Sequence, residues 1–120
     1  MRILLLALAA LLVAAAPATA APADDFEALL DEHYRWLLRE NPTQATALGV
    51  RDHDQRIRDL SNEAREARVR QAQAFLDRLE AIPAEALPPG RRVDRAILRR
   101  NLAETVEEWR FGQRDMLFTT

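Results

Sequence analysis

Only two histidines occur in this chain of 120 residues, and they are its first candidates for acid–base or metal chemistry. His53 lies between Asp52 and Asp54, and carboxylates on both sides of an imidazole can bind a cation or hold a proton. The triplet falls in a polar segment without helical periodicity, and binding residues concentrate in loops. Asp52, His53 and Asp54 are therefore candidate metal ligands, although a solvated turn with its acids paired to nearby arginines is the favoured alternative. His33 lies on an apolar stripe and is interpreted as a packing residue.

The remaining composition excludes several kinds of chemistry. No His-Glu-x-x-His motif is present, because Tyr34 follows His33 and Asp54 follows His53. There is no cysteine, and all 17 basic residues are arginine, which excludes thiol nucleophiles, disulfides and lysine Schiff bases. Neither a glycine-rich phosphate loop nor a G-x-S-x-G motif occurs, and a net charge of −2 argues against nucleic-acid binding. We therefore assign no catalytic or cofactor-binding residue to this chain.

The first twenty residues differ from the rest and predict a secretory signal. Arg2 is followed by an uninterrupted apolar run of 14 residues, Ile3–Ala16, and Ala18-Thr19-Ala20 supplies the small residues that signal peptidase accepts. A membrane-spanning helix needs about 20 apolar residues, so cleavage before Ala21 is expected instead of a retained anchor. Residues 1–20 are thus predicted to be a cleaved signal peptide, and the protein to be exported and either periplasmic or secreted.

Residues 21–120 are predicted to be all-α. Apolar residues recur at every third or fourth position in residues 25–40, 61–81 and 91–111, which predicts three amphipathic helices. A short helix is expected between Asn41-Pro42 and Gly49, where a proline begins it and a glycine ends it. Residues 50–60 lack a period and are expected to form an ordered loop. Together these elements predict an antiparallel helical subdomain of about four helices, with extended structure considered only for Met116–Thr119.

Individual residues are expected to begin, end and bury these helices. Asp24, Asn41 and Ser61 are predicted N-caps, and Gly49 and Gly112 are predicted C-terminal caps. The residues predicted to face the core are Phe26, Leu29, Leu30, His33, Leu37 and Leu38 in the first helix, with Trp36 off the stripe; Ile57 and Leu60 in the loop; Ala64, either Ala67 or Arg68, Ala72, Phe75, Leu76, Leu79 and Ile82 in the third helix; and Val93, either Ala96 or Ile97, Leu102, Val106 and Trp109 in the fourth.

Four stretches of the chain resemble the amino-terminal region of the bacterial DUF885 family. They are LLDEHYRWLLRENPTQATALGV (29–50), DQRIRDLS (54–61), FLDRLEAIPAEALPPGRRVDRAILRRNL (75–102) and WRFGQRD (109–115). No single motif is diagnostic, and it is the order and spacing of the four that carry the resemblance. The triplet Arg51-Asp52-His53 departs from the usual sequence pattern of the family, so the resemblance is weakest in that loop.

The resemblance implies a large, exported α-helical protein similar to zinc-dependent metallopeptidases of the HExxH type. In such proteins the metal ligands and the glutamate base lie far downstream, and no position of this sequence matches them. Zinc and a peptide substrate are therefore implied for full-length relatives, and no cofactor is implied within this chain. Residues 21–120 are then expected to be an incomplete amino-terminal helical region, inactive alone, whose partner is the missing C-terminal catalytic region.

The distribution of apolar residues agrees with an incomplete region. Trp109, Phe111, Met116, Leu117 and Phe118 crowd the last twelve residues, and such a cluster favours packing against another part of a protein. The alternative is a self-standing periplasmic helical module that binds a partner through its apolar stripes. Neither hypothesis includes a nucleic-acid partner or a stable membrane anchor after signal cleavage.

Overall fold

The computed structural model describes residues 21–111, and these residues form helices and connecting turns with no strand among them. The elements are α1 (Pro22–Glu40), α2 (Pro42–Ala47), α3 (Asn62–Glu80), the 3-10 turn η1 (Ala84–Ala86) and α4 (Pro89–Arg110). The predicted all-α fold with about four helices is confirmed. The predicted signal peptide (1–20), Gly112 and Met116–Thr119 lie outside the described residues. No helix within 21–111 is long and apolar enough to cross a membrane.

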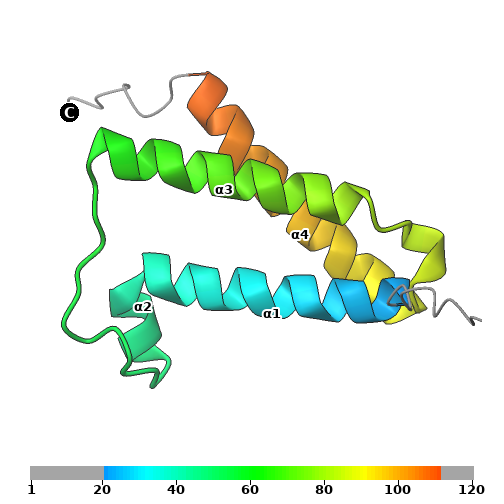
Figure 1. Cartoon of the computed structure of the whole chain (residues 1–120), viewed down its shortest axis with the longest axis horizontal. Helices are drawn as coiled ribbons and strands as arrows, with labels where there is room; N and C mark the ends of the chain where they lie inside the picture. Colours follow the sequence, from blue (N-terminus) through cyan, green and yellow to red (C-terminus); the bar gives the residue numbers. More distant parts are fainter. Residues whose placement is uncertain (1–20, 112–120) are drawn as a thin grey trace, which may run out of the picture.

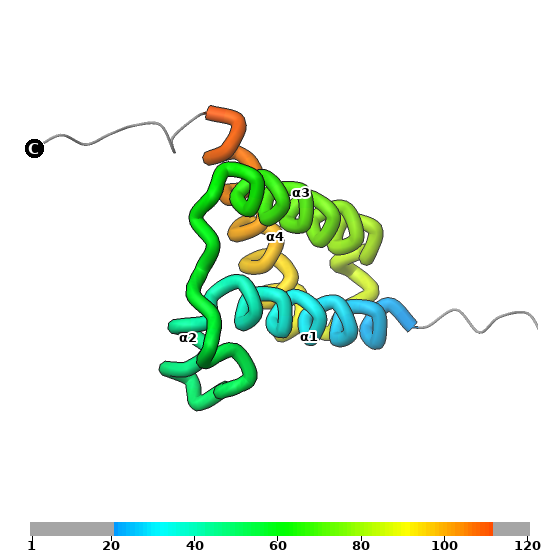
Figure 2. The backbone as a smooth tube through the Cα atoms, turned by 60° about the vertical axis from the view of Figure 1, so that its left-hand side comes forward, coloured from blue at the N-terminus to red at the C-terminus, as the bar shows by residue number. Residues whose placement is uncertain are grey.

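The three long helices form a splayed arrangement. α3 runs antiparallel to α1, and α4 returns in the general direction of α1 (Figure 1). α1 and α4 begin close together, where Arg91 Nε lies 2.6 Å from Glu27 Oε1, and they diverge along their length (Figure 2). We call the end near Glu27 and Arg91 the closed end. α3 packs against both helices, so the divergence leaves a space between α1 and the far half of α4.

The hydrophobic core lies between α3 and the two diverging helices. Five of its residues, Phe26, Leu29, Phe75, Leu79 and Leu87, are at most 2% exposed, and burying each side chain contributes about 1.5–3 kcal/mol. The core cluster comprises Phe26, Leu29, Trp36, Ala72, Phe75, Leu76, Leu79, Ile82, Leu87, Leu98 and Leu102. Leu38, Pro42 and Ala45 are also buried, outside this cluster, where α1 turns into α2. One main core and one small corner therefore hold the described fold together.

The predicted core face of α1 is partly wrong, and the loop prediction is wrong. Trp36 is buried, whereas Leu37 is 37% exposed. Trp36 follows Leu29 by seven positions and so continues the row of α1 that faces α3, which places it in the core despite its predicted position off the stripe. Ile57 and Leu60 are 87% and 62% exposed, because the segment before α3 runs outside the core instead of folding under it.

The predicted core face of α4 is also displaced. Val93 and Ile97 are 59% and 55% exposed, whereas Leu98 is buried together with the predicted Leu102. Arg95, Leu98 and Leu102 follow one another at helical spacing on the face of α4 that meets the core. Because this series begins with an arginine, the sequence shows no apolar pattern at its start. An arginine at the start of a core row is compatible with burial because its stem packs while its guanidinium finds polar partners.

Two arginines of α4, Arg92 and Arg95, donate hydrogen bonds to backbone carbonyls along the connection between α3 and α4. Arg95 donates from Nε to the Ile82 carbonyl at 2.9 Å and from a terminal nitrogen to the Leu79 carbonyl at 3.2 Å. Arg92 donates likewise to the carbonyls of Leu87 and Glu85, at 2.8 and 3.2 Å. The carbonyl groups at the end of a helix lack partners within it, so these guanidinium groups stabilise the end of α3 and the turn that follows.

The helix ends confirm one predicted cap and correct others. Ser61 Oγ accepts from the Ala64 N–H at 3.2 Å, as predicted. α1 begins at Pro22 with Ala21 as its N-cap, so Asp24 lies inside the first turn and does not cap it; proline fits this first position because its missing N–H needs no partner there. Asn41 occupies the N-cap position of α2, as predicted, but its side chain makes no capping hydrogen bond there and instead donates to the Leu37 carbonyl at the end of α1, at 2.9 Å. α4 begins at Pro89, slightly before the predicted position.

Gly49 ends α2 in the left-handed conformation, as predicted, with φ of 83°. Its N–H donates to the Thr46 carbonyl and the Val50 N–H donates to the Ala45 carbonyl, both at 2.9 Å, which is the Schellman pattern.

Gly49→Ala is expected to lower the free energy of unfolding by about 1–2 kcal/mol, measured by urea denaturation. A Cβ at this position would meet open space, so the cost comes from the left-handed backbone alone. Gly90→Ala is the matched control, because its Cβ would also meet open space and Gly90 has no positive φ. Equal stability of the two variants would contradict the backbone explanation.

Candidate functional site

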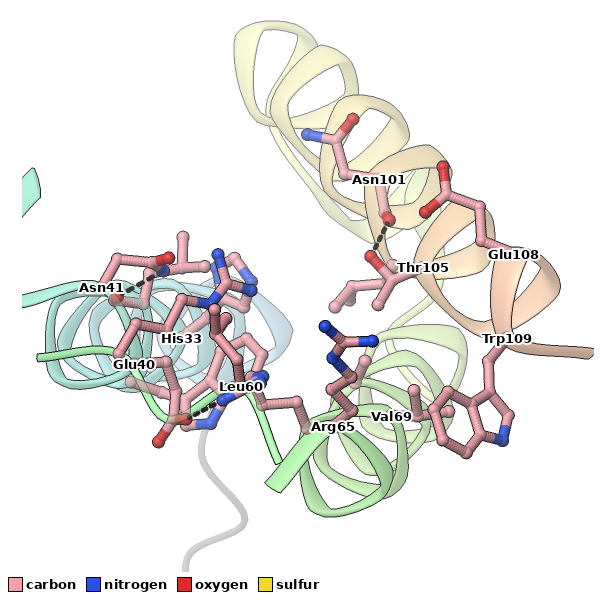
Figure 3. Close-up of a pocket in the computed structure, with 16 residues that line it drawn as sticks. His33, Glu40, Asn41, Leu60, Arg65, Val69, Asn101, Thr105, Glu108 and Trp109 are labelled. Atoms are coloured by element: carbon pink, nitrogen blue, oxygen red, sulfur yellow. Dashed lines mark hydrogen bonds and ion pairs between the residues drawn. The ribbon is translucent and has the colours of Figure 1, made fainter. Parts of the chain in front are cut away.

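The space between the diverging helices is a groove with a volume of about 660 Å³. The C-terminal half of α1, the N-terminal half of α3, the C-terminal half of α4 and the segment before α3 surround it (Figure 3). The residues that line it are His33, Trp36, Leu37, Glu40, Asn41, Arg58, Leu60, Arg65, Arg68, Val69, Ala72, Asn101, Leu102, Thr105, Glu108 and Trp109. Apolar and charged side chains are thus mixed along one open surface.

Aromatic rings form the α1 wall of the groove where that wall meets the core. His33 packs edge-on against Phe75 with ring centroids 5.3 Å apart, and its ring lies 5.7 Å from that of Trp36. Trp36 and Phe75 are themselves 5.5 Å apart. The prediction that His33 is a packing residue is therefore confirmed by its position between two aromatic side chains.

His33 is expected to make stability depend on pH. Burial lowers its pKa below the usual 6.5, because the charged imidazolium loses hydration beside the aromatic rings. The unfolded chain therefore takes up the proton first as the pH falls, and the free energy of unfolding should decrease from about pH 6.5 downward until the folded pKa is passed. Urea midpoints measured between pH 7.5 and 5 should fall less steeply in His33→Gln than in wild type. His53→Gln is the control, and the same slope in all three proteins would contradict the assignment.

Arg68 connects three segments at the wide end of the groove. Its side chain is 10% exposed, and one terminal nitrogen lies 3.4 Å from Glu40 Oε2 at the end of α1. The other donates to the Asp59 carbonyl at 2.7 Å. Asp59 in turn accepts from the Ser61 N–H, and this hydrogen bond is the main reason that the pKa of Asp59 is lowered. Arg68 therefore holds the segment before α3 against both helices.

Asp52, His53 and Asp54 lie in a turn outside the groove. The Asp54 carboxylate accepts from the Thr46 hydroxyl and lies 3.7 Å from a terminal nitrogen of Arg51, so a predicted arginine–acid pair in this loop is present. The metal-binding hypothesis for these three residues stays a prediction, and their geometry gives it no added support.

The charged residues that line the groove are not among the site residues predicted from the sequence. On α4, Arg100 and Glu104 form an exposed ion pair at 2.7 Å. Glu108, Arg65 and Arg58, in contrast, form no ion pair with other residues of the 21–111 region. Glu108 follows Asn101 and Thr105 at helical spacing, so the three polar residues share one face of α4. No oppositely charged residue lies three or four positions from Glu108, and this is the sequence signal that points to the groove-lining face of α4.

A family model described as "Bacterial protein of unknown function (DUF885)" matches residues 42–120. The chain belongs to the DUF885 family. No curated protein and no solved structure matches the chain.

The DUF885 match includes α2, α3 and α4, and begins directly after α1. Three of the four segments that surround the groove, namely the segment before α3, α3 and α4, therefore lie within the part of the chain that matches DUF885. The resemblance suggested by the sequence is confirmed at the level of the family, whose description names no activity.

The zinc that the DUF885 resemblance implies for longer relatives does not fit the described part of this chain. Within residues 21–111, no three His, Asp, Glu or Cys side chains lie together in an arrangement that could hold a metal ion. Structural and catalytic zinc sites use three or four such ligands. The described residues therefore offer a groove with apolar walls and free charges, and no built metal centre.

Proposed function

We propose that this chain is the amino-terminal helical region of an exported DUF885 protein and has a docking role instead of a catalytic one. Its partner would be a downstream region similar to zinc-dependent metallopeptidases, with a peptide as the substrate of the whole protein. Residues 1–20 would be the signal peptide and residues 21–120 the helical region. The apolar run before Pro17 and the start of α1 at Pro22, next to the expected cleavage point, support export.

The observation that carries this proposal is the uncovered groove. Three helices packed around one core leave apolar side chains such as Leu37 and Leu60 partly or largely exposed on one concave surface. Exposed apolar surface that is gathered in a groove marks a binding site more often than scattered apolar residues do. Packing of the downstream region into this groove would remove that surface from water and make the chain a wall of the substrate cleft.

A second candidate function is a self-standing periplasmic module that binds another protein. The core favours this alternative, because Phe26, Phe75 and Leu79 are fully buried without any additional chain. The DNA that follows the codon of Thr120 separates the two candidates. An open frame that encodes a distal HExxH supports the first, and a stop codon supports the second.

The expected absence of peptidase activity is tested directly on the exported chain. Incubation with zinc and a mixed peptide library is expected to give no turnover. Turnover that a chelator abolishes would overturn the docking role. Where a downstream region is encoded, it should bind this chain when the two are produced separately, and failure to bind would overturn the proposed partner.

A further inference from the structure

The faces of α1 and α4 that line the groove continue beyond it toward the closed end. On α1, Leu30, Tyr34 and Leu37 follow one another at spacings of four and three, and on α4, Ile97 lies one helical turn before the groove residue Asn101, so members of each row share a face. Tyr34 is 51% exposed, Leu37 37% and Ile97 55%. The exposed apolar surface therefore extends from the groove toward the closed end on both walls, and forms a strip instead of an isolated pocket.

The shape of this strip suits a helix. α1, α3 and α4 enclose the groove on three sides, with α4 inclined to the other two helices, and the space between α1 and α4 lies opposite α3 (Figure 3). In a four-helix bundle this fourth position is filled, and neighbouring helices pack with their axes about 8–10 Å apart. An amphipathic helix laid along the groove would cover both rows at once, as in other helix-in-groove complexes.

The charges in the groove define the chemistry of that helix. Arg65 projects from α3 into the middle of the groove (Figure 3). Arg58, in the segment before α3, also lines the groove. Neither forms an ion pair with any residue between 21 and 111, in contrast to Arg68, which is paired with Glu40. Burial of an unpaired guanidinium under a neutral helix would be costly, so its partner is expected to carry carboxylates at this place. Glu108, on the opposite wall, disfavours an acidic group on the α4 side.

We propose that the groove receives an amphipathic helix from the downstream part of the same protein, with an apolar stripe and acidic residues that face Arg65 and Arg58. This inference rests on the proposed docking function and adds the chemistry of the docked element. The carboxylates specify the orientation of the helix, because Arg65 on α3 attracts them and Glu108 on α4 repels them. The apolar stripe supplies the buried area.

The chain contains its own reporters for this test. Its two tryptophans, Trp36 and Trp109, both line the groove. The probe is a designed 18-residue helical peptide without tryptophan, with leucines at alternating spacings of three and four and glutamates along one edge of that stripe. A second peptide carries glutamine at every glutamate position. Each is titrated at low salt into the full chain, purified after periplasmic export, and tryptophan emission is recorded.

The acidic peptide is expected to shift the emission to the blue and to bind at least tenfold more tightly than the glutamine peptide. Arg65→Gln should remove most of this preference. Arg70→Gln is the matched control on the same helix, because Arg70 is exposed and paired with Glu66 at 3.7 Å outside the groove. Circular dichroism and thermal melting confirm that both variants remain folded, and Arg58→Gln repeats the test if Arg65→Gln does not.

Each other outcome overturns the inference. Equal binding of both peptides, no binding of either, or equal effects of the two variants would show that the arginines do not select an acidic helix. Self-association in sedimentation experiments that Arg65→Gln abolishes would make the occupant a second copy of this chain. Binding of the protein's own downstream region that Arg65→Gln leaves unchanged would keep the docking function and reject only the acidic helix.

Discussion

Replacement of Phe75 by alanine is expected to lower the free energy of unfolding by about 3–5 kcal/mol, which is the usual cost of removing a buried aromatic side chain. Phe75 is 1% exposed and packs against the rings of both His33 and Trp36, which also contact each other. The guanidinium of Arg78 covers it at 5.9 Å from the ring centroid. The substitution therefore leaves a cavity where the core meets the groove, and Trp36 emission should shift to the red as water approaches.

Urea denaturation followed by circular dichroism measures this loss. Phe75→Leu, which keeps most of the volume, should cost about 1.5 kcal/mol or less and remains measurable if the alanine variant does not fold. Phe111→Ala is the control, because Phe111 is 73% exposed and its loss should change stability by less than about 0.5 kcal/mol. Equal stability of Phe75→Ala and Phe111→Ala would show that the aromatic cluster does not anchor the fold.

Arg68→Ala is expected to lower the free energy of unfolding by about 2 kcal/mol. The side chain is 10% exposed and supplies a hydrogen bond to the Asp59 carbonyl and an ion pair to Glu40. Loss of one partner of a fully buried pair costs about 3–5 kcal/mol, but Glu40 is 24% exposed and water replaces part of the interaction, so the smaller value applies. The segment before α3 should also become more accessible to proteases.

Arg68→Lys separates charge from geometry. Lysine keeps the positive charge but cannot reach two acceptors with one planar group, so about half of the loss should remain. Arg70→Ala is the control for a solvent-exposed pair, with an expected effect below about 0.5 kcal/mol. If Arg68→Ala were no more harmful than Arg70→Ala, the connection between α1, α3 and the preceding segment would not depend on Arg68.

The helices could be predicted from the sequence because their signals are local. Ser61 and Gly49 mark helix ends through their own chemistry, and the period of Phe75, Leu76 and Leu79 is unambiguous. The core face of α4 could not be predicted, because Arg95 occupies the start of the row that leads to Leu98. The guanidinium finds its acceptors on another helix, and that arrangement exists only after the chain has folded.

The groove could not be predicted for a related reason. Arg68 is set apart from Arg65 by its contacts with Glu40, which lies 28 positions earlier in the chain, and with the Asp59 carbonyl. Sequence spacing leaves Arg68 as an alternative to Ala67 on the core face and otherwise places both arginines among the charged residues of α3. The fold buries Arg68 and leaves Arg65 without an ion pair within the described residues. The loop prediction that buried Leu60 failed similarly, because it assumed that an apolar residue in a loop returns to the core instead of lining an open surface.

The divergence of α1 and α4 makes the closed end a pivot and α4 a lever. α4 has 22 residues and is therefore about 33 Å long, so a rotation of about 5° around its first turn moves its far end by about 3 Å. Small changes near Glu27 and Arg91 are thus magnified at the mouth of the groove. The ion pair between Glu27 and Arg91 lies at this pivot, at the opposite end of α4 from the groove.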